Sequence, residues 1–595
     1  MFLFGLFRSF QPLQNALGFG AGDFIELALA AFLFLAALIW RPWIEPFALR
    51  FAGKTGWCMA VLAVLPVALR LALLPHHPVP SPDVYDEFSH LLVADTLRHF
   101  RLANPPHPLP QFFETFFVLQ DPTYSSIYPI GQGLVLAFGW TLFGLPWAGV
   151  VLSVSAFCAL CYWMLRAWTT PIWALVGGLL VVFQFGPLNP WMNNYWGGAF
   201  PAAAGCLVFG ALPRLRESGR ARYGALLGAG FGAHLLSRPY ESIFLAIGVI
   251  LFFWPILRNA ELLRKLAKGF MTAALVALPA IGIAMLQNKQ VTGKWTTLPE
   301  VLSRYQYGVP AALTFQASPV PHRELTPQQE LDYRMQLSFQ GDKAETLGSY
   351  LERLLYRARF YRFFFYAPLY LALPFLLGAL GEFRFVWVLL TISAFVLGIN
   401  FFPAFQYHYL AAVTCLFVLA AVTGLERLSK LSLAGFSAGR EAAALIVLLC
   451  AANFIFWYGL HVFDSEEWSL AMRQYETWDT INHRNPERRI AAGKRLAQIP
   501  GKLLVFVRYW PQHIFQDEWV WNAADIDRAR IVWARDLGDA EDQKLIQYYP
   551  DRAVWLLEPD FPPFRLTPYR PRQNVATPDQ PKPNVFENPG PSESN

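Results

Sequence analysis

Three carboxylates, those of Asp83, Asp86 and Glu87, lie within five residues of one another at the end of an apolar segment. Acids at a hydrocarbon boundary are poorly solvated, so a cluster of them there is costly unless it is used. A helical pattern begins at Asp86 and places His90 on the same side as Asp86 and Glu87. The cluster indicates acid–base chemistry. The plainer interpretation is a helix start whose acids complement the helix dipole.

Further polar groups lie at the ends of expected membrane helices. The plain interpretation of each is snorkelling or an interfacial aromatic belt. Arg238 favours a functional interpretation because it is confined to a short turn before Pro239. Charge topology puts all of these groups on the same face of the membrane as the acids. They are Asn194 and Tyr195, His234 and Arg238, Arg359 and Arg362, and His408 with Tyr409.

The composition is that of a polytopic membrane protein. Hydrophobic residues make up 55% of the 595 and charged residues 15%, against about 25% charged in a typical soluble domain. The net charge of +6 comes mostly from short loops, which indicates membrane topology and no nucleic-acid partner. All six cysteines lie in apolar segments, so the CxxC spacing of Cys158 and Cys161 indicates core packing.

The hydropathy pattern predicts a mostly α fold of about twelve transmembrane helices plus interfacial helices. Two Arg/Lys-rich loops, around 214–222 and 258–268, are assigned to the cytoplasm. Loops 76–147 and 288–362 and the chain after 461 then lie outside, and a helix at 128–143 dips into the membrane without crossing it. The expected spans are 23–40, 56–75, 148–165, 172–186, 198–213, 223–237, 241–257, 269–287, 363–380, 385–400, 408–424 and 442–460.

Four domains are expected along the chain. Residues 1–55 form an N-terminal membrane helix, and residues 56–460 form the main membrane domain. Residues 461–560 read as a small exterior α/β domain, with helices at 487–498 and 540–549 and strands at 502–507, 530–533 and 553–557. Residues 561–595 are rich in proline and polar residues, which predicts a disordered tail.

Carboxylates and cations at a lipid boundary suit one reaction class. A carboxylate can take the proton of an acceptor hydroxyl that attacks the anomeric carbon of a sugar. A lipid-linked phosphate leaving group needs positive charge, which arginine supplies in a well-shaped form. The lipid tail enters sideways from the bilayer, which explains why such an enzyme is built of membrane helices.

At this point the sequence resembles the C-type superfamily of integral-membrane glycosyltransferases. The similarity is to the branch of protein O-mannosyltransferases, aminoarabinose transferases and related bacterial enzymes, and it covers roughly residues 56–425. Asp86-Glu87 lies in the first large exterior loop, followed by Tyr128-Pro129-Ile130-Gly131 before the dipping helix. The other motifs that carry the resemblance are Phe143-Gly144-Leu145-Pro146-Trp147, Ser237-Arg238-Pro239 and His408-Tyr409.

The resemblance implies a polyprenyl-phosphate-linked sugar donor, inversion at the anomeric carbon, and Asp86 as the base. It puts Arg238 near the lipid phosphate. Some superfamily members bind a divalent metal at the acidic motif, and Asp83, Asp86 and Glu87 with His90 could supply ligands for one. No cofactor is assigned with certainty. The β-trefoil insert of the eukaryotic mannosyltransferases is missing, which puts a protein acceptor in doubt.

These expectations define a multi-pass enzyme of the inner membrane whose site faces outward. Its partners are the lipid-linked donor, membrane lipids and an envelope acceptor that is a glycan, lipid or protein. The alternatives are a lipid-linked glycan transporter or flippase, and an O-antigen-type polymerase or ligase. Asp86 and Glu87 are assigned to catalysis. Substrate binding is assigned to Asp83, His90, Tyr128, Asn194, Tyr195, His234, Arg238, Arg359, Arg362, His408 and Tyr409.

Overall fold

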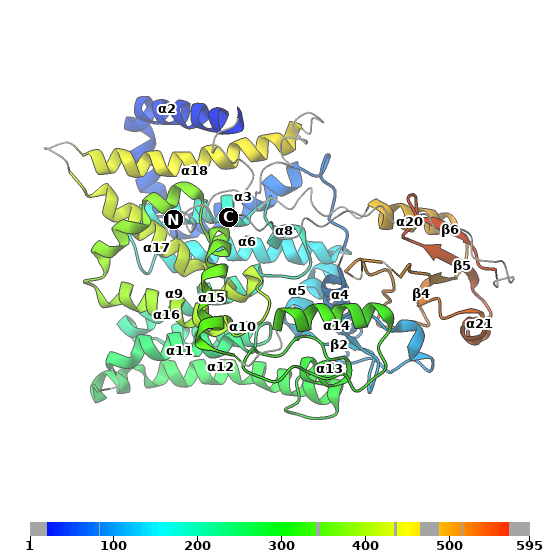
Figure 1. Ribbon diagram of the computed structural model, residues 1–595. Coiled ribbons are helices and arrows are strands. Elements are labelled where there is room, and N and C mark those ends of the chain that lie inside the picture. Colours follow the sequence, from blue (N-terminus) through cyan, green and yellow to red (C-terminus); the bar gives the residue numbers. More distant parts are fainter. Residues whose placement is uncertain are drawn as a thin grey trace.

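The protein consists of a helical membrane domain and a small α/β domain at one end of it (Figure 1). The long helices run side by side, and the C-terminal strands lie beyond their ends, next to α4 and α5. We call this end the α4 side. The structure, a computed structural model, describes residues 21–82, 84–256, 258–340, 345–432, 437–463, 487–511, 513–514 and 516–570.

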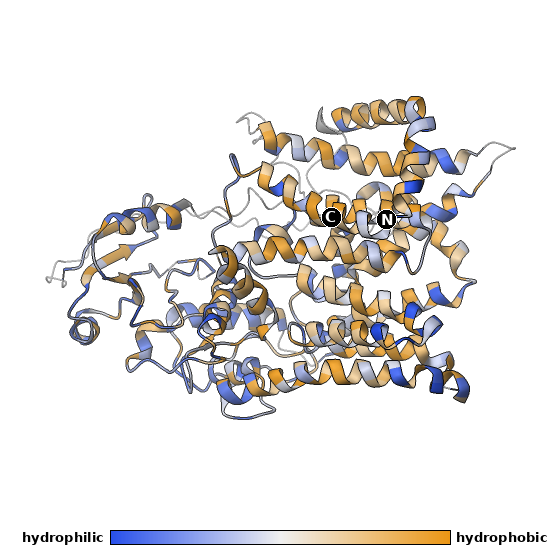
Figure 2. Ribbon diagram, turned by 180° about the vertical axis from the view of Figure 1, so that it is seen from behind, coloured by the Kyte–Doolittle hydropathy of each residue, from blue (hydrophilic) through white to orange (hydrophobic). Residues whose placement is uncertain are grey.

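Six stretches of helix are long and apolar enough to cross a membrane, which makes the protein a multi-pass membrane protein. Hydrophobic residues dominate the long helices, and hydrophilic residues gather in the loops at their ends (Figure 2). The six stretches lie in α2 (Ala21–Ala52), α3 (Thr55–Ala72), α6 (Pro146–Leu165), α12 (Ala260–Thr292), η6 with α17 (Tyr407–Val413 and Thr414–Ser429) and α18 (Ala438–Phe463).

The remaining expected spans are shorter or less apolar, so a total of twelve stays a prediction. The apolar helices among them are α7 (Pro171–Phe185), α11 (Glu241–Phe253) and α16 (Phe383–Ile399). Helices α9 (Ala199–Ser218) and α10 (Ala221–Leu235) pack on α6 and α12. A short helix, α8 (Pro190–Asn193), precedes α9, and a single 3-10 turn, η2 (Trp254–Ile256), extends α11.

The expected helix over 363–380 is wrong. This segment forms a series of short 3-10 helices, η3 (Ala358–Phe364), η4 (Ala367–Leu371) and η5 (Leu373–Ala379). Pro368 and Pro374 are the second residues of η4 and η5. Proline lacks the amide hydrogen that a continuous α-helix needs and clashes with the preceding turn, so each proline starts a new short element.

The first loop on the α4 side folds around two helices, α4 (Tyr85–Arg98) and α5 (Ile130–Phe143). Between them lie η1 (Pro110–Phe113) and the short antiparallel strands β1 (Val118–Leu119) and β2 (Ser125–Ser126). Eleven of the fourteen residues of α4 are buried, so this helix is a core element and no surface helix. The second loop carries α13 (Pro299–Tyr307), α14 (Pro327–Gln340) and α15 (Leu347–Arg357).

The C-terminal domain is a four-stranded sheet of order β4-β3-β5-β6 with two helices. Strand β3 (Leu503–Val507) pairs in parallel with β4 (Ile531–Arg535) and β5 (Ala553–Glu558), and α20 (Glu487–Gln498) and α21 (Asp539–Tyr548) flank the sheet. The antiparallel strand β6 (Arg565–Pro568) falls in the range expected to be tail. Its pairing with β5 extends the domain past Asp560; residues 571–595 lie outside the described residues.

Both faces of β3 are buried, as in a covered parallel sheet. One face packs against α20 and Trp519. The other face, with Leu504 and Phe506, packs against α21 and also against Leu92 of α4 and Phe112 of the first loop. The membrane domain thus supplies part of the covering layer of the sheet, and the two domains share one hydrophobic core.

Candidate active site

Asp86 is half-buried in the first turn of α4 and accepts a hydrogen bond from the Tyr128 hydroxyl. Tyr128 precedes α5, and its backbone carbonyl accepts a 2.9 Å hydrogen bond from Gln287 near the end of α12. Helix α4 begins here because Glu87 caps it: the Val84 amide donates to Glu87 Oε2 at 3.3 Å. The cap holds the first turn and therefore the position of Asp86.

Glu87 is almost fully buried, at 2% exposure, and serves the backbone. Besides the cap, its Oε1 accepts a 2.9 Å hydrogen bond from the amide of Tyr195. The hydroxyl of Tyr195 donates to the carbonyl of Pro80 at 2.8 Å. Glu87 and Tyr195 therefore tie the start of α4 to the loop before α9.

His90 lies one turn after Asp86, and its ring stacks on Tyr128 at 4.1 Å between centroids. Burial lowers the pKa of His90 to about 3, and the charge of Arg238 adds to the shift. The imidazole is therefore neutral in the folded protein near pH 7. Its Nδ1 is buried without a hydrogen-bond partner among the described residues, which leaves it available to a ligand.

Arg238 lies in the turn between α10 and α11, three residues after α10 ends at Leu235. Its guanidinium is 3.8 Å from Glu241 and lies over the ring of Tyr409 at 5.3 Å. His234 is fully buried and hydrogen-bonds Ser242 at 2.7 Å, while the Ser242 hydroxyl donates to the Arg238 carbonyl. His234 therefore fixes the turn, and Arg238 keeps donors for a ligand.

A close backbone contact joins the two parts of the site. The amide of Gly131 in α5 donates to the carbonyl of Leu236 at 2.8 Å. A Cβ at Gly131 would lie 2.2 Å from Ser237 Oγ, so only glycine allows this approach. Tyr128 and Arg238, far apart in sequence, are held together by this contact.

His408 and Tyr409, in η6, complete the site wall. His408 contacts Trp196 edge to face at 6.1 Å, and Tyr409 contacts Phe402 at 5.2 Å. Asn194 turns the chain before Trp196, since its Oδ1 accepts the amide of that residue at 3.1 Å. Asn194 thus shapes the backbone, whereas Trp196, His408 and Tyr409 present aromatic surface.

No described contact brings Arg359 to this cluster. Arg359 donates to the Tyr356 hydroxyl and lies over the Tyr356 and Phe360 rings at 3.8 and 4.8 Å. Arg362 is buried, and Asp83 lies outside the described residues. The structure thus assembles Asp86, His90, Tyr128, Arg238, His408 and Tyr409 from the predicted set, while Glu87, Asn194, Tyr195 and His234 support them.

Asp332 in α14 is a residue that sequence reasoning missed. It is fully buried, and Gln336 donates to both of its carboxylate oxygens at 3.1 Å. Burial raises the pKa of Asp332 to about 7, with a further rise from the charge of Asp86. The acid lies in a charge-rich stretch of the second loop, where nothing in the local sequence distinguishes it from its solvated neighbours.

The described residues do not form a metal centre. No group of three His, Cys, Asp or Glu side chains among them is arranged to hold a metal ion. Glu87, a predicted ligand, has both oxygens engaged by backbone amides. Asp83, another predicted ligand, lies outside the described residues, and no step below is assigned to a metal.

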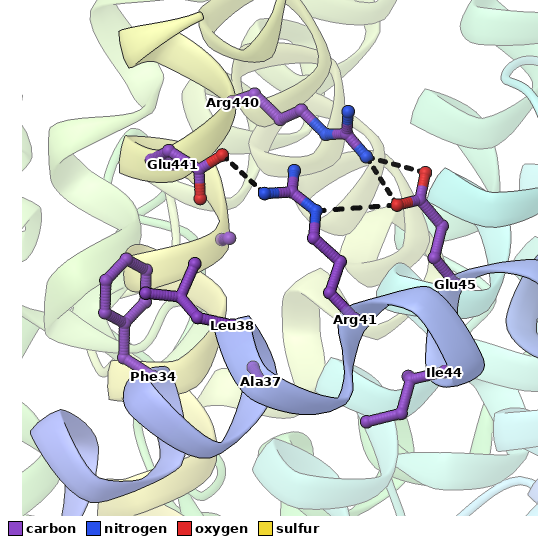
Figure 3. Close-up of a pocket in the computed structure, with 9 residues that line it drawn as sticks. Phe34, Ala37, Leu38, Arg41, Ile44, Glu45, Arg440 and Glu441 are labelled. Atoms are coloured by element: carbon purple, nitrogen blue, oxygen red, sulfur yellow. Dashed lines mark hydrogen bonds and ion pairs between the residues drawn. The ribbon is translucent and has the colours of Figure 1, made fainter.

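A cavity of about 220 Å³ opens elsewhere, between α2 and α18 (Figure 3). Its cations are already paired with carboxylates: Arg41 with Glu441 at 2.8 Å, and Arg440 with Glu45 at 2.6 Å. Apolar side chains such as Phe34 and Leu38 line the rest. Because its charges are internally neutralised, this cavity is no candidate for binding a phosphate.

No family model and no curated protein sequence matches the chain. Solved structures do match it. ArnT from Cupriavidus metallidurans in the apo state is 12% identical, with a TM-score of 0.45, over 85% of this chain and 93% of that chain. ArnT bound to undecaprenyl phosphate has 11% identity and a TM-score of 0.49 over the same shares.

A third match is the archaeal oligosaccharyltransferase AglB from Archaeoglobus fulgidus, in complex with an inhibitory peptide and a dolichol-phosphate. It is 12% identical, with a TM-score of 0.37, over 87% of this chain and 70% of that chain.

Proposed function

We propose that this protein transfers a sugar from a polyprenyl-phosphate-linked donor to a hydroxyl of an envelope acceptor, with inversion. The observation that carries the proposal is the pairing of Asp86 with Tyr128 beside Arg238, which keeps spare donors, at the α4 side of a membrane domain. The proposal includes the orientation: the α4 side faces the exterior of the inner membrane.

In the proposed reaction, Asp86 accepts the proton of the acceptor hydroxyl as its oxygen attacks the anomeric carbon. The bond between that carbon and the phosphate oxygen breaks, and the phosphate leaves with its electron pair and stays on the lipid. Attack and departure on opposite faces of the sugar invert the anomeric centre. The phosphate needs no proton, so a cation suffices for the leaving group.

Five neighbouring residues adapt the site to this role. Tyr128 donates to Asp86 and so orients the carboxylate. Arg238 contributes charge-assisted hydrogen bonds to the phosphate that strengthen as the negative charge develops. His90 stays neutral and contributes hydrogen bonding through Nδ1 without repelling Arg238. The aromatic surface of Trp196 and Tyr409 suits the apolar face of a sugar ring.

The test uses purified protein in nanodiscs with radiolabelled polyprenyl-phosphate-linked pentoses and hexoses and a bacterial envelope extract. We expect transfer of label, release of polyprenyl phosphate, and loss of both in Asp86→Asn, an isosteric change that removes the base. The matched control is Glu330→Gln, because Glu330 is a partly exposed acid of α14 paired with Arg334. Near wild-type turnover of Asp86→Asn would contradict the assignment. Movement of the labelled lipid across the bilayer of proteoliposomes, without any transferred label, would indicate a flippase.

A further inference from the structure

We propose that the C-terminal domain positions the catalytic helix, with Trp521 as a positioning residue for Asp86. This inference rests on the proposed function of Asp86. The segment 517–524, between β3 and β4, lies along α4 and contacts it at three points. We call this segment the clamp.

The three contacts involve different parts of α4. Val84, the cap residue, forms an antiparallel β-bridge with Asp517. The indole Nε1–H of Trp521 donates to the carbonyl of Phe88 at 3.0 Å, and the two rings lie 5.4 Å apart. The amide of Ala524 donates to the carboxylate of Asp95 at 2.8 Å. The clamp therefore extends from the beginning of α4 to its last turn.

The geometry of the clamp matches the length of the helix. The seven residue steps from Phe88 to Asp95 rise by roughly 10.5 Å along an α-helix. The three residue steps from Trp521 to Ala524 span roughly 10 Å when extended. Between Trp521 and Ala524 the spacing of the clamp contacts therefore matches the rise of the helix.

Asp95 supports this interpretation because of its position. It is buried in the last turn of α4, where the helix dipole disfavours an acid. The amide of Ala524 and a 3.3 Å ion pair with Arg98 compensate that position. Asp95 therefore lowers the stability of α4 as an isolated helix, and it is placed where it can accept a hydrogen bond from the clamp.

The clamp itself is fixed to the sheet and to the first loop. Asn522 exchanges two hydrogen bonds with the backbone of Trp533 in β4, at 2.7 and 2.9 Å. Glu518 is buried and accepts from the Tyr509 hydroxyl and the Val520 amide, both at 2.8 Å, and from Thr115 of the first loop. Because these hydrogen bonds hold the clamp rigidly, the clamp can fix the position of α4 relative to the sheet.

The consequence for catalysis follows from the location of Asp86. It lies between Val84 and Phe88, so the first turn of α4 is held on both sides of the acid by the clamp. A displacement of about 1 Å at a reacting group can lower a rate about 100-fold. Loss of one anchor shifts Asp86 without changing the phosphate site.

The experiment compares Trp521→Phe, which keeps a ring beside Phe88 and loses the N–H donor, with Trp510→Phe. Trp510 is the matched control because its ring contacts Phe561 inside the C-terminal domain. The assay is release of polyprenyl phosphate from the donor that serves the wild type. We expect kcat to fall about 10-fold in Trp521→Phe, with the donor KM within about twofold of wild type. For Trp510→Phe we expect both kcat and the donor KM to stay within about twofold of the wild-type values.

A second variant tests whether position is the cause. Val84→Cys with Asp517→Cys places two thiols at a bridged pair, and we expect oxidation of that pair to restore the kcat of Trp521→Phe. Hydrogen exchange of the α4 amides, which needs no substrate, should be faster in Trp521→Phe and slow again after oxidation. If the wild-type protein shows no sugar transfer, the proposed function is refuted. Hydrogen exchange of the α4 amides would still test the clamp, because it does not depend on activity. Unchanged kcat and unchanged exchange in Trp521→Phe would overturn the inference, as would a loss of activity accompanied by an equal rise in KM.

Discussion

At the scale of single residues, the site is defined by which polar atoms are already satisfied. Glu87 and His234 are buried, and their hydrogen bonds hold backbone segments in place. Arg238 differs from Arg357, whose guanidinium donates to the carbonyls of Ile399, Phe402 and Pro403. The arginine with spare donors is the one beside the candidate base, so Arg238 is the residue to test for phosphate binding.

We expect Arg238→Ala to lower turnover about 10²–10³-fold, because a stabiliser of the leaving charge is removed. Arg238→Lys should be intermediate, since lysine keeps the charge and loses the bidentate geometry. The measurement is kcat and donor KM in the nanodisc assay. Arg359→Ala is the matched control, because Arg359 lies against Tyr356 and Phe360 away from the cluster. Full activity of Arg238→Ala with loss in Arg359→Ala would move the phosphate site to Arg359.

The neutral state of His90 predicts a pH dependence of stability. Its pKa is about 3 in the folded protein, against about 6.5 in an unfolded chain. Between these values only the unfolded state takes up the proton, so this contribution to stability is present above pH 6.5 and is lost as the pH falls toward 3. Thermal unfolding in detergent at pH 7 and pH 5 should show a smaller loss for His90→Asn than for wild type. An equal loss in both would show that His90 is not the group responsible.

At the scale of elements, local patterns predicted the helices and strands well. Helix α4 begins at Tyr85, one residue before the expected start, and α20 coincides with the expected 487–498. The break at 363–380 also has a local cause, because Pro368 and Pro374 were visible in the sequence. The contact between Glu87 and Tyr195 could not be predicted from the sequence. Hydrophobic periodicity indicates which face of a helix is buried, but it does not indicate which distant segment packs against that face.

The contact of α5 with the α10–α11 turn gives a prediction at this scale. Gly131→Ala puts a Cβ 2.2 Å from Ser237 Oγ and 2.8 Å from the Leu236 carbonyl, which must separate the two elements. We expect a loss of about 1–3 kcal/mol in stability, the usual cost of overpacking, and at least a tenfold loss of turnover. Unfolding in detergent measures the loss of stability, and the transfer assay measures the loss of turnover. Gly282→Ala is the control, because a Cβ there meets open space.

At the scale of the whole molecule, one buried polar network joins three distant segments on the α4 side. Glu114 of the first loop binds Tyr307 at 2.9 Å and Arg323 at 2.6 Å, both from the second loop. Arg535 of the C-terminal domain donates to the Glu114 carbonyl at 2.5 Å and to Gln328 at 2.8 Å. The two loops and the C-terminal domain therefore form one unit on one side of the membrane domain.

This unit makes a prediction about topology. Cysteines introduced at Lys294 and Arg528, both exposed, should react with a membrane-impermeant thiol reagent in intact spheroplasts. One at Glu217, exposed in the last turn of α9, should react only after the membrane is opened. The native cysteines are buried and give a low background. Labelling of Glu217→Cys alone would reverse the orientation and remove the case for an exterior site.

The core shared by the first loop and the last strands has a consequence for biogenesis. Phe112 packs on Phe506, and His107 bonds to Tyr549 across 442 residues of sequence. At roughly 5–20 residues per second, a ribosome needs about 20–90 s to make the chain between such partners. During that interval the acid-bearing loop stays unfinished, with aromatic side chains uncovered. The first loop can therefore complete its hydrophobic core only after the C-terminal strands have been synthesised.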